Sequence, residues 1–253
     1  MKDRISDLLN LELSPKWIST FHSLCVKMLR IHGHLIGFNN NFTIYDQSDS
    51  TKLVRNCMRD SDIDTKQYSP KRIQAHISSL KNQRILPGEA VEFAQSFFDV
   101  KVAEIYSSYQ KKLMLANSMD FDDLLIKAVE LLETSDKSLN YWSSKFQYIM
   151  IDEYQDTNMV QYRLVELLAS KHKNICVVGD SDQSIYAFRG ADIRNIEEFE
   201  SDFKNAKVIS LEKNYRSSQK ILDIANAVIS NNPRKKDKKL WTDNDEGLSL
   251  IHI

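Results

Sequence analysis

Two adjacent carboxylates, Asp152 and Glu153, directly follow a short apolar run at residues 148–151. Four consecutive apolar residues without helical spacing predict a strand that is buried on both faces of a parallel sheet. The acids would then lie at the carboxyl end of that strand, which is the edge where open α/β sheets bind ligands. An aspartate there can hold Mg²⁺ beside a phosphate chain, and a neighbouring glutamate can accept the proton of an attacking water. The alternative is that the two acids only begin a surface loop.

A second set of polar side chains is expected at the same edge. Asn158 and Gln161 have the pattern of a capping box, which predicts a helix from there to about Ala169. The apolar run at residues 174–178 predicts the next strand, so the order is that of a β-α-β unit. Strands joined by one crossover helix usually lie in one sheet, so the residues that follow them meet at one edge. This order therefore places three further residues beside the acid pair, namely Gly179, Asp180 and Asp182.

The segment 179–191, GDSDQSIYAFRGA, combines polar and aromatic residues that suit a nucleotide and DNA. Gln183 can orient a water or contact a γ-phosphate, and Arg189 can neutralise charge that develops during phosphoryl transfer. Tyr186 and Phe188 could each offer a ring to an unstacked base. The alternative is that these two aromatic side chains belong to the hydrophobic core.

Hydroxyl groups near the start of the chain form a further candidate site. Residues 17–20 predict a strand, and a helix with a regular apolar side follows. Thr20, His22 and Ser23 lie at this junction, where hydroxyls and backbone N–H groups could contact a phosphate. The alternative role of these residues is to cap the helix.

A long helical segment interrupts the predicted strands. Residues 42–45 predict a short strand, after which strand signals stop until about residue 118. Ser69 before Pro70 is typical of a helix start, and the apolar spacing is helical, so we expect an all-helical insertion. Its basic side chains either contact DNA phosphates or form a solvated face, and they are Lys66, Lys71, Arg72, Lys81 and Arg84.

Further elements are predicted on either side of the acid pair. Asp120 has the pattern of an N-cap for a helix that ends near Leu132. Residues 207–211 predict a strand, and the apolar spacing of residues 221–229 predicts a helix. The basic run 234–239 predicts a linker or a phosphate-contacting loop, and residues 248–253 begin another strand.

The composition excludes several classes of protein. With 253 residues, of which 42% are hydrophobic, the chain can bury one large core or a core with an inserted subdomain. The formal net charge of -1 means that affinity for nucleic acid must come from a local patch. Three cysteines without CxxC spacing argue against a zinc site and a disulfide framework and fit a reducing cytoplasm. No apolar run has transmembrane length and the start has no signal-peptide core, so we expect a soluble cytoplasmic protein without a membrane partner.

Five motifs resemble those of a known family in both order and spacing. They are TFHS (20–23), DFDDLL (120–125), DEYQDTN (152–158), GDSDQSIYAFRGA (179–191) and NYRS (214–217). With them the chain resembles the UvrD/Rep/PcrA group of superfamily 1 DNA helicases. The resemblance implies an α/β fold with a truncated RecA-like parallel sheet of the P-loop NTPase type and an inserted all-helical subdomain. The implied boundaries are 1–45 with 119–211 for a partial RecA-like ATPase domain, 46–118 for the inserted helical subdomain and 212–253 for the start of a second RecA-like domain.

The resemblance implies that the cofactors are ATP and Mg²⁺. Asp152 would hold Mg²⁺ through water, and Glu153 would be the general base for ATP hydrolysis. Gln183 would sense the γ-phosphate. Arg216 would act as an arginine finger from the second domain, and Tyr215 would stack on adenine.

The resemblance also implies single-stranded and duplex DNA as partners. Tyr186 and Phe188 would stack on bases of the single strand, and Arg189 would link this aromatic pair to the nucleotide site. The family commonly has Trp where this chain has Phe188, so we expect stacking that is weaker but retained. The implied DNA contacts also include the TFHS residues Thr20, His22 and Ser23.

The chain departs from the family in lacking a phosphate-binding loop. None of its six glycines is followed by lysine, whereas the Walker A loop needs Gly-Lys-Ser/Thr. We therefore expect an internal piece of a longer ATP-dependent DNA helicase that unwinds duplex DNA in repair or replication, with accessory proteins as possible partners. The parent is expected to be monomeric. The piece alone is expected to be inactive and, with uncovered sheet edges, able to self-associate.

Two other functions fit part of the sequence. The chain alone could be a non-catalytic module that binds single-stranded DNA. A metal-dependent nuclease could use the carboxylates of the acid cluster, but the cluster supplies no His, and the surrounding Gln, Arg and aromatic residues suit a nucleotide switch better. The carboxylates of that cluster are Asp152, Glu153, Asp156, Asp180 and Asp182.

Overall fold

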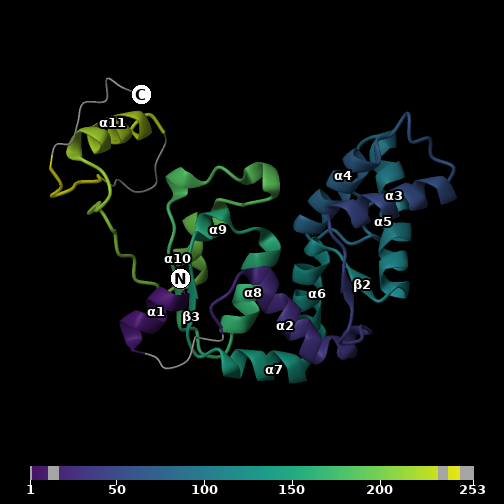
Figure 1. Cartoon of the computed structure of the whole chain (residues 1–253), viewed down its shortest axis with the longest axis horizontal. Helices are drawn as coiled ribbons and strands as arrows, with labels where there is room; N and C mark the ends of the chain where they lie inside the picture. Colours follow the sequence, from purple (N-terminus) through teal and green to yellow (C-terminus); the bar gives the residue numbers. More distant parts are fainter. Residues whose placement is uncertain (1, 11–16, 233–238, 246–253) are drawn as a thin grey trace.

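The chain folds as a mixture of helices and small parallel sheets (Figure 1). The computed structural model describes residues 2–10, 17–232 and 239–245. Within them the α-helices are α1 Lys2–Leu9, α2 Phe21–His32, α3 Gln47–Asp60, α4 Pro70–Asn82, α5 Phe97–Leu115, α6 Phe121–Thr134, α7 Asp136–Lys145, α8 Met159–Ala169, α9 Arg194–Glu197, α10 Phe199–Asp202 and α11 Gln219–Ile229. The strands are β1 Thr43–Ile44, β2 Ser118–Met119, β3 Ile149–Ile151 and β4 Ile175–Val177. Single turns of 3-10 helix are η1 Gly33–Ile36, η2 Tyr154–Asp156, η3 Ser181–Gln183 and η4 Ala187–Arg189.

Strands β3 and β4 pair in parallel, with α8 between them in the sequence. This confirms the predicted β-α-β order and the capping box, in which Asn158 and Gln161 each bond the backbone N–H of the other. The prediction that β3 is buried on both faces is wrong, because Met150 is 79% exposed while Ile151 is 9% exposed. Successive side chains of a strand point to opposite faces, and the described helices cover only the face that carries Ile149 and Ile151.

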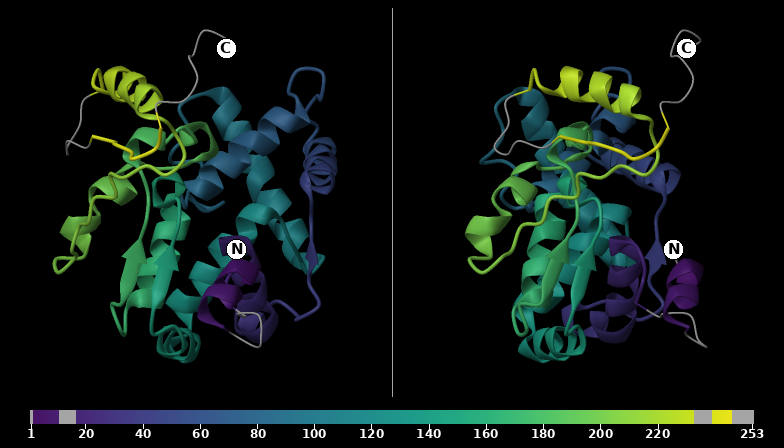
Figure 2. Two further views of the ribbon diagram at one scale, coloured as in Figure 1. Left: turned by 60° about the vertical axis from the view of Figure 1, so that its left-hand side comes forward. Right: turned by 90° about the vertical axis from the view of Figure 1, so that its left-hand side faces the viewer.

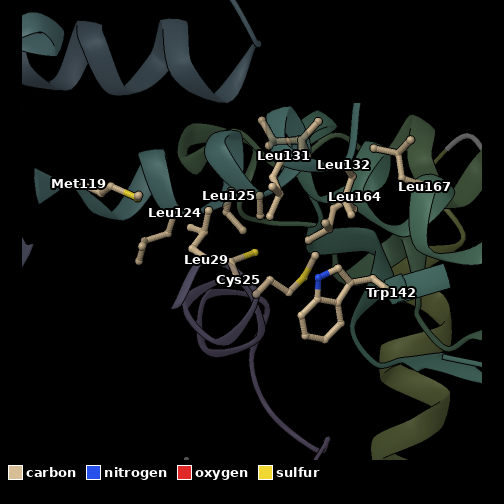
Figure 3. Close-up of a cluster of buried hydrophobic side chains, with 14 of the residues drawn as sticks. Cys25, Leu29, Met119, Leu124, Leu125, Leu131, Leu132, Trp142, Leu164 and Leu167 are labelled. Carbon is tan, nitrogen blue, oxygen red and sulfur yellow. The ribbon is translucent and has the colours of Figure 1, made fainter. Parts of the chain in front are cut away.

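The larger hydrophobic core lies between α2, α6, α7 and α8 (Figure 3). Cys25 and Leu29 of α2 lie close to Leu124 and Leu125 of α6, and the fully buried ring of Trp142 fills the end of the cluster. The indole N–H of Trp142 donates to Nδ1 of His32 at 3.0 Å, so this buried donor is satisfied. Helix α6 starts as predicted, with a capping box between Asp120 and Asp123.

A second core lies within the helical segment, where α3, α4 and α5 pack around Val54, Ile73, Ile77 and Tyr106. The segment leaves the rest of the chain at β1 and returns at β2. These two strands pair in parallel, with Thr43 opposite Ser118. Figure 1 shows the three helices grouped at the end of the molecule opposite to α11. Entry and exit are therefore side by side, and the helices between them have a core of their own.

A buried ionic network joins this helical segment to α6. The ammonium group of Lys81, at the end of α4, donates to Asp120 at 2.7 Å and to Asp123 at 2.8 Å, and Lys81 has no exposed surface. The hydroxyl of Tyr109 donates to Asp120 at 2.8 Å. Burial raises the pKa of Asp123 to about 6, while Lys81 outweighs the same burial effect at Asp120 and lowers the pKa of that carboxyl. The hypothesis that Lys81 contacts DNA phosphate is therefore wrong, because two buried carboxylates already hold its charge.

Two predicted strands are not strands in the structure. Residues 17–20 are irregular, because the Trp17 ring packs edge-on against Trp142 and Phe146 instead of entering a sheet. Residues 207–211 are also irregular, and the side chains of Val208, Ile209 and Leu211 stay exposed because no described strand pairs with them. Apolar residues alone do not make a strand when no neighbouring backbone can accept its hydrogen bonds.

The last described part contains α11, as predicted, together with residues 239–245. Asn226 of α11 bonds the backbone of Leu240 in both directions, at 3.0 and 3.3 Å, and Lys213 forms an isolated parallel bridge with Trp241. The basic run 234–239, apart from its last residue, and the strand predicted at 248–253 fall outside the described residues. None of the described helices combines the length and the apolar composition that crossing a membrane requires.

Candidate functional site

The acid pair lies immediately after β3, on a strained turn. Asp152 and Glu153 are both exposed, and Glu153 has left-handed backbone angles (φ 53°, ψ 42°), which are uncommon for a residue with a side chain. The turn is fixed on both sides. The Glu153 N–H donates to the Asp152 carboxylate at 3.1 Å, and the Tyr154 N–H donates to Val178 O at 2.9 Å. The two carboxylates are thus held open to solvent at the carboxyl end of the β3–β4 pair, as the sequence predicted.

Gln155 connects the acid pair to the loop that follows β4. Its side chain is 1% exposed, and its Nε2 donates to Glu153 Oε2 at 2.7 Å. Its Oε1 accepts from the Asp180 backbone N–H at 3.0 Å. A Cβ on Gly179 would lie 2.5 Å from this Oε1, so any larger residue there would have to displace the Gln155 amide. The motif places this amide between two acids, but only the fold reveals that it bridges two loops, and sequence patterns alone did not single it out.

Gln183 belongs to the loop on the far side of this bridge. Its side chain is exposed, and its Nε2 donates to the Asp180 carboxylate at 2.9 Å. The Asp180 backbone is the group that Gln155 holds. Glu153, Gln155, Asp180 and Gln183 therefore form one chain of hydrogen bonds across the ends of β3 and β4. A displacement of Gln183 can reach Glu153 through these three hydrogen bonds.

The carboxylates fit a hydrated Mg²⁺ better than a metal held by protein alone. Among the described residues no group of three or more His, Cys, Asp or Glu is placed to hold a metal ion. Mg²⁺ usually keeps several waters and takes one or two carboxylates together with substrate phosphates. Asp152 offers an exposed carboxylate of this kind. The geometry gives no support to the nuclease alternative, which needs several of these acids on one ion.

A cleft of about 1130 Å³ opens beside the acid loop. Helix α4, the start of α8 and the segment around η4 contribute its walls. Its lining contains three residues predicted to bind DNA, which come from distant parts of the sequence: His22, Tyr186 and Phe188. The fold thus brings the TFHS and GDSDQSIYAFRGA motifs together.

The aromatic pair in this cleft is not part of a core. Phe188 is 78% exposed and Tyr186 is 37% exposed, with ring centroids 6.1 Å apart and planes inclined by 44°. Large exposed rings in a cleft are suited to stacking on unpaired bases. This exposure rules out the alternative that the two rings fill the hydrophobic core.

The described lining of the cleft is polar but carries little positive charge. Asp122, Asp156 and Asp192 contribute carboxylates, and Arg194 is bound to Asp192 at 2.5 Å. The pKa of His22 is lowered by burial, which outweighs the attraction of Asp122, so its ring is neutral near pH 7. Most other polar groups of the lining are amides and hydroxyls. Such a surface suits bases and sugars better than phosphates.

The other residues predicted to contact DNA are Thr20, Ser23 and Arg189. Thr20 caps α2, with its Oγ1 accepting from the Ser23 N–H at 3.3 Å, so the capping role predicted as the alternative is real. Both residues are also exposed. They lie at the start of α2, as does His22, which lines the cleft. Arg189 ends η4, between Phe188 and the left-handed Gly190 (φ +88°).

Tyr215 and Arg216 lie in a turn that Asn214 forms, since its side chain accepts from the backbone N–H groups of Arg216 and Ser217 at 2.9 and 2.8 Å. Tyr215 is 80% exposed. Neither residue forms a hydrogen bond or ion pair with Asp152 or Glu153 among the residues described. Figure 2 shows the neighbouring helix α11 on the side of the molecule toward which β3 and β4 run. The contacts of Tyr215 and Arg216 with a nucleotide therefore stay a prediction.

Replacing Phe188 with alanine should weaken binding of single-stranded DNA by about 1–3 kcal/mol, roughly 5- to 150-fold in Kd, because one stacking surface is lost. Fluorescence anisotropy with a labelled oligothymidylate measures the change. Phe93→Ala is a matched control, since Phe93 is also exposed (58%) but lies outside the cleft lining. Unchanged affinity together with a lower thermal midpoint would instead assign Phe188 a packing role.

Comparison with known proteins agrees with the motifs. The family model for the UvrD/REP helicase N-terminal domain matches residues 1–204, and that for the UvrD-like helicase C-terminal domain matches residues 209–253. The chain is 47% identical over 252 residues to the ATP-dependent DNA helicase PcrA of Bacillus subtilis, covering 100% of this chain and 34% of that protein. PcrA of Staphylococcus aureus (strain Mu50) is 47% identical over 247 residues, covering 98% of this chain and 34% of the relative. The chain thus spans about one third of the length of the curated relatives it matches. It belongs to the UvrD/REP helicase family.

Proposed function

We propose that the chain is part of the motor of an ATP-dependent DNA helicase that moves on single-stranded DNA and unwinds duplex DNA in repair or replication. The observation that carries the proposal is the bridge through Gln155, which joins Glu153 to the loop that continues into the aromatic pair of the cleft. A motor needs such a connection, because nucleotide hydrolysis at one place must alter DNA contacts at another. Family membership and the 47% identity to proteins named ATP-dependent DNA helicase support it.

The domain division goes with this proposal. Residues 1–45 and 119–211 would form a partial RecA-like domain, and 212–253 the start of a second. The separate hydrophobic core of α3, α4 and α5 and the adjacent β1 and β2 support residues 46–118 as an inserted subdomain. The change between the two matched family models, at residues 204–209, supports a boundary close to the proposed one.

The nucleotide site would use exposed groups at the ends of β3 and β4. Asp152 would hold Mg²⁺ through water. When Mg²⁺–ATP is bound, ATP would supply the phosphate to be transferred, and Mg²⁺ would neutralise the negative charge of the phosphates. Glu153 would accept the proton of the attacking water, with its carboxylate oriented by the Gln155 amide. Gln183 would contact the γ-phosphate. Tyr215 and Arg216 would reach the nucleotide only when their segment closes over the sheet.

The DNA site would be the cleft. Tyr186 and Phe188 would stack on bases, and His22, which lines the same cleft, would contact the same strand. Thr20 and Ser23 would contact the backbone beside it, and Arg189 would connect the aromatic pair to the nucleotide. The low positive charge of the described lining predicts that binding here depends less steeply on salt than binding by a basic groove.

The isolated chain would bind single-stranded DNA without turning over ATP, because it has no Gly-Lys-Ser/Thr loop to hold the phosphates. A non-catalytic DNA-binding module is thus the second candidate function, and it applies to this stretch alone. The exposed outer face of β3 and β4, with Tyr148 and Met150, supports self-association of the isolated chain. A cytoplasmic location and accessory repair or replication proteins belong to the proposal for the full-length protein, which would be monomeric.

Turnover and cleavage assays separate the candidate functions. ATP hydrolysis is measured with and without oligothymidylate, on this chain and on the full-length protein that carries it, and DNA cleavage is followed in Mg²⁺. The motor proposal predicts turnover stimulated by DNA in the full-length protein and none in the chain alone. Stimulated turnover by the chain alone would contradict the role given to the absent phosphate loop. DNA cleavage would favour the nuclease.

A further inference from the structure

One side chain of the helical segment bonds to two of the sequence motifs and lies close to a third. Asn82 is the last residue of α4, and its Nδ2 donates to Asp122 of the DFDDLL motif at 3.3 Å. Its Oδ1 accepts from Nδ2 of Asn158, the last residue of the DEYQDTN motif, at 2.5 Å. A Cβ on Gly190, in the GDSDQSIYAFRGA motif, would lie only 3.2 Å from Asn82 Cβ.

Contacts within the helical segment hold Asn82 in place. Its Nδ2 also donates to Ser78 O, one turn earlier in α4, at 2.8 Å. The preceding residue, Lys81, is anchored in the buried network with Asp120 and Asp123. Asn82 is therefore tied to the helical segment, and it lines the same cleft as Phe188.

Asn158 connects Asn82 to the acid loop, which runs from Glu153 to Asn158. Its side chain caps α8 by accepting from the Gln161 N–H at 2.9 Å, and it is 7% exposed. The preceding residue, Thr157, accepts through its backbone oxygen from Asp192 N–H at 2.9 Å and from Asn195 Nδ2 at 3.0 Å. The loop from Glu153 to Asn158 is thus held at one end by Gln155 and at the other by Asn82.

We propose that Asn82 is a positioning residue through which DNA in the cleft stabilises the acid loop, by way of the Asn82–Asn158 hydrogen bond. The inference rests on the proposed function, because it assumes that single-stranded DNA occupies the cleft. DNA that packs between α4 and the η4 segment restrains Asn82, and the restrained Asn82 keeps Asn158 and the loop before it in the observed conformation. The helical segment then acts on catalysis without contacting the nucleotide.

Hydrogen exchange in the chain itself tests this coupling. The reporters are the N–H groups of Tyr154, Asp156 and Thr157, which bond to Val178 O, Glu153 O and Tyr154 O. Exchange is compared without DNA and with saturating oligothymidylate, so that a moderate change in affinity does not affect the result. In the wild type, DNA is expected to slow exchange of these groups about tenfold, which corresponds to a coupling within the usual range.

Two variants remove the bond from opposite sides. Asn82→Ala deletes the acceptor, and Asn158→Asp deletes the donor while keeping an N-cap of equal quality for α8. Both should reduce the DNA-dependent slowing to less than about twofold, since the coupling no longer passes through the bond. Asn56→Ala is the control, because Asn56 is an exposed residue of α3 whose side chain accepts only from Arg59 on the same helix.

The outcomes distinguish the inference from the function on which it rests. If the wild-type chain fails to bind oligothymidylate, the proposed DNA cleft is wrong and the inference falls with it. If the wild type binds but shows no slowing, or if slowing persists in Asn158→Asp, the inference alone is overturned. Should Asn82→Ala fail to fold, Asn158→Asp decides by itself. Loss of slowing in Asn158→Asp, with slowing kept in Asn56→Ala, supports the coupling.

Discussion

Replacing Glu153 with glutamine is expected to slow ATP hydrolysis by the full-length protein about 10²- to 10⁴-fold, the usual contribution of a general base. Nucleotide binding should be retained, because Asp152 and its carboxylate are unchanged. The local structure should also persist. Gln155 Nε2 now donates to Glu153 Oε2 at 2.7 Å, and an amide oxygen at the same place can accept that hydrogen bond.

Single-turnover hydrolysis and equilibrium binding of a fluorescent ATP analogue measure the two effects separately. Glu130→Gln serves as the control, since this glutamate pairs with Lys127 on the surface of α6. Hydrolysis at the wild-type rate in Glu153→Gln would mean that another group accepts the proton. Loss of binding together with hydrolysis would mean that Glu153 holds the nucleotide or the metal rather than the water.

Replacing Lys81 with methionine is expected to lower the free energy of unfolding by about 3–5 kcal/mol, because it leaves buried carboxylates without their cation. Asp120 and Asp123 both lose a hydrogen-bonded ammonium group at 2.7–2.8 Å, and neither has room to reach water. Urea denaturation measures the loss. Lys52→Met is the control, because Lys52 forms only an exposed pair with Asp49 and should change stability by less than about 1 kcal/mol.

The loss in Lys81→Met should depend on pH in a definite direction. In the wild type burial raises the pKa of Asp123 to about 6 in the folded state, against an ordinary value of 3.8. A group with a raised folded pKa contributes stability that is present below its unfolded pKa and disappears as pH rises through the folded pKa. Removing the cation raises the folded pKa of Asp123 further and takes away the attraction that lowers the folded pKa of Asp120, so the penalty should be larger at pH 8 than at pH 5. A penalty equal to that of Lys52→Met at both pH values would show that the network contributes little.

Local sequence patterns determined the elements whose stabilising contacts lie within a few residues. The N-cap at Asp120 and the capping box at Asn158 formed as predicted, since each joins a side chain to a backbone three residues away. The β-α-β order and the placement of Asp180 beside the acid pair also followed, because one short crossover leaves few other arrangements. The motifs identified the family for the same reason, since their residue types and spacing are themselves the signal.

Only the tertiary structure decided which side chains are buried and which partners they meet. In the sequence Lys81 looked like the other basic residues of the helical segment, yet among the five named above it alone is fully buried. Its ammonium group contacts carboxylates about 40 residues away. Met150 looked like its apolar neighbours, yet it faces outward, and residues 17–20 and 207–211 found no strand to pair with. The contacts of Asn82 and Gln155 likewise join residues 25 to 76 positions apart. Burial and pairing of this kind depend on where distant backbone lies, and a local pattern of residue types does not contain that information.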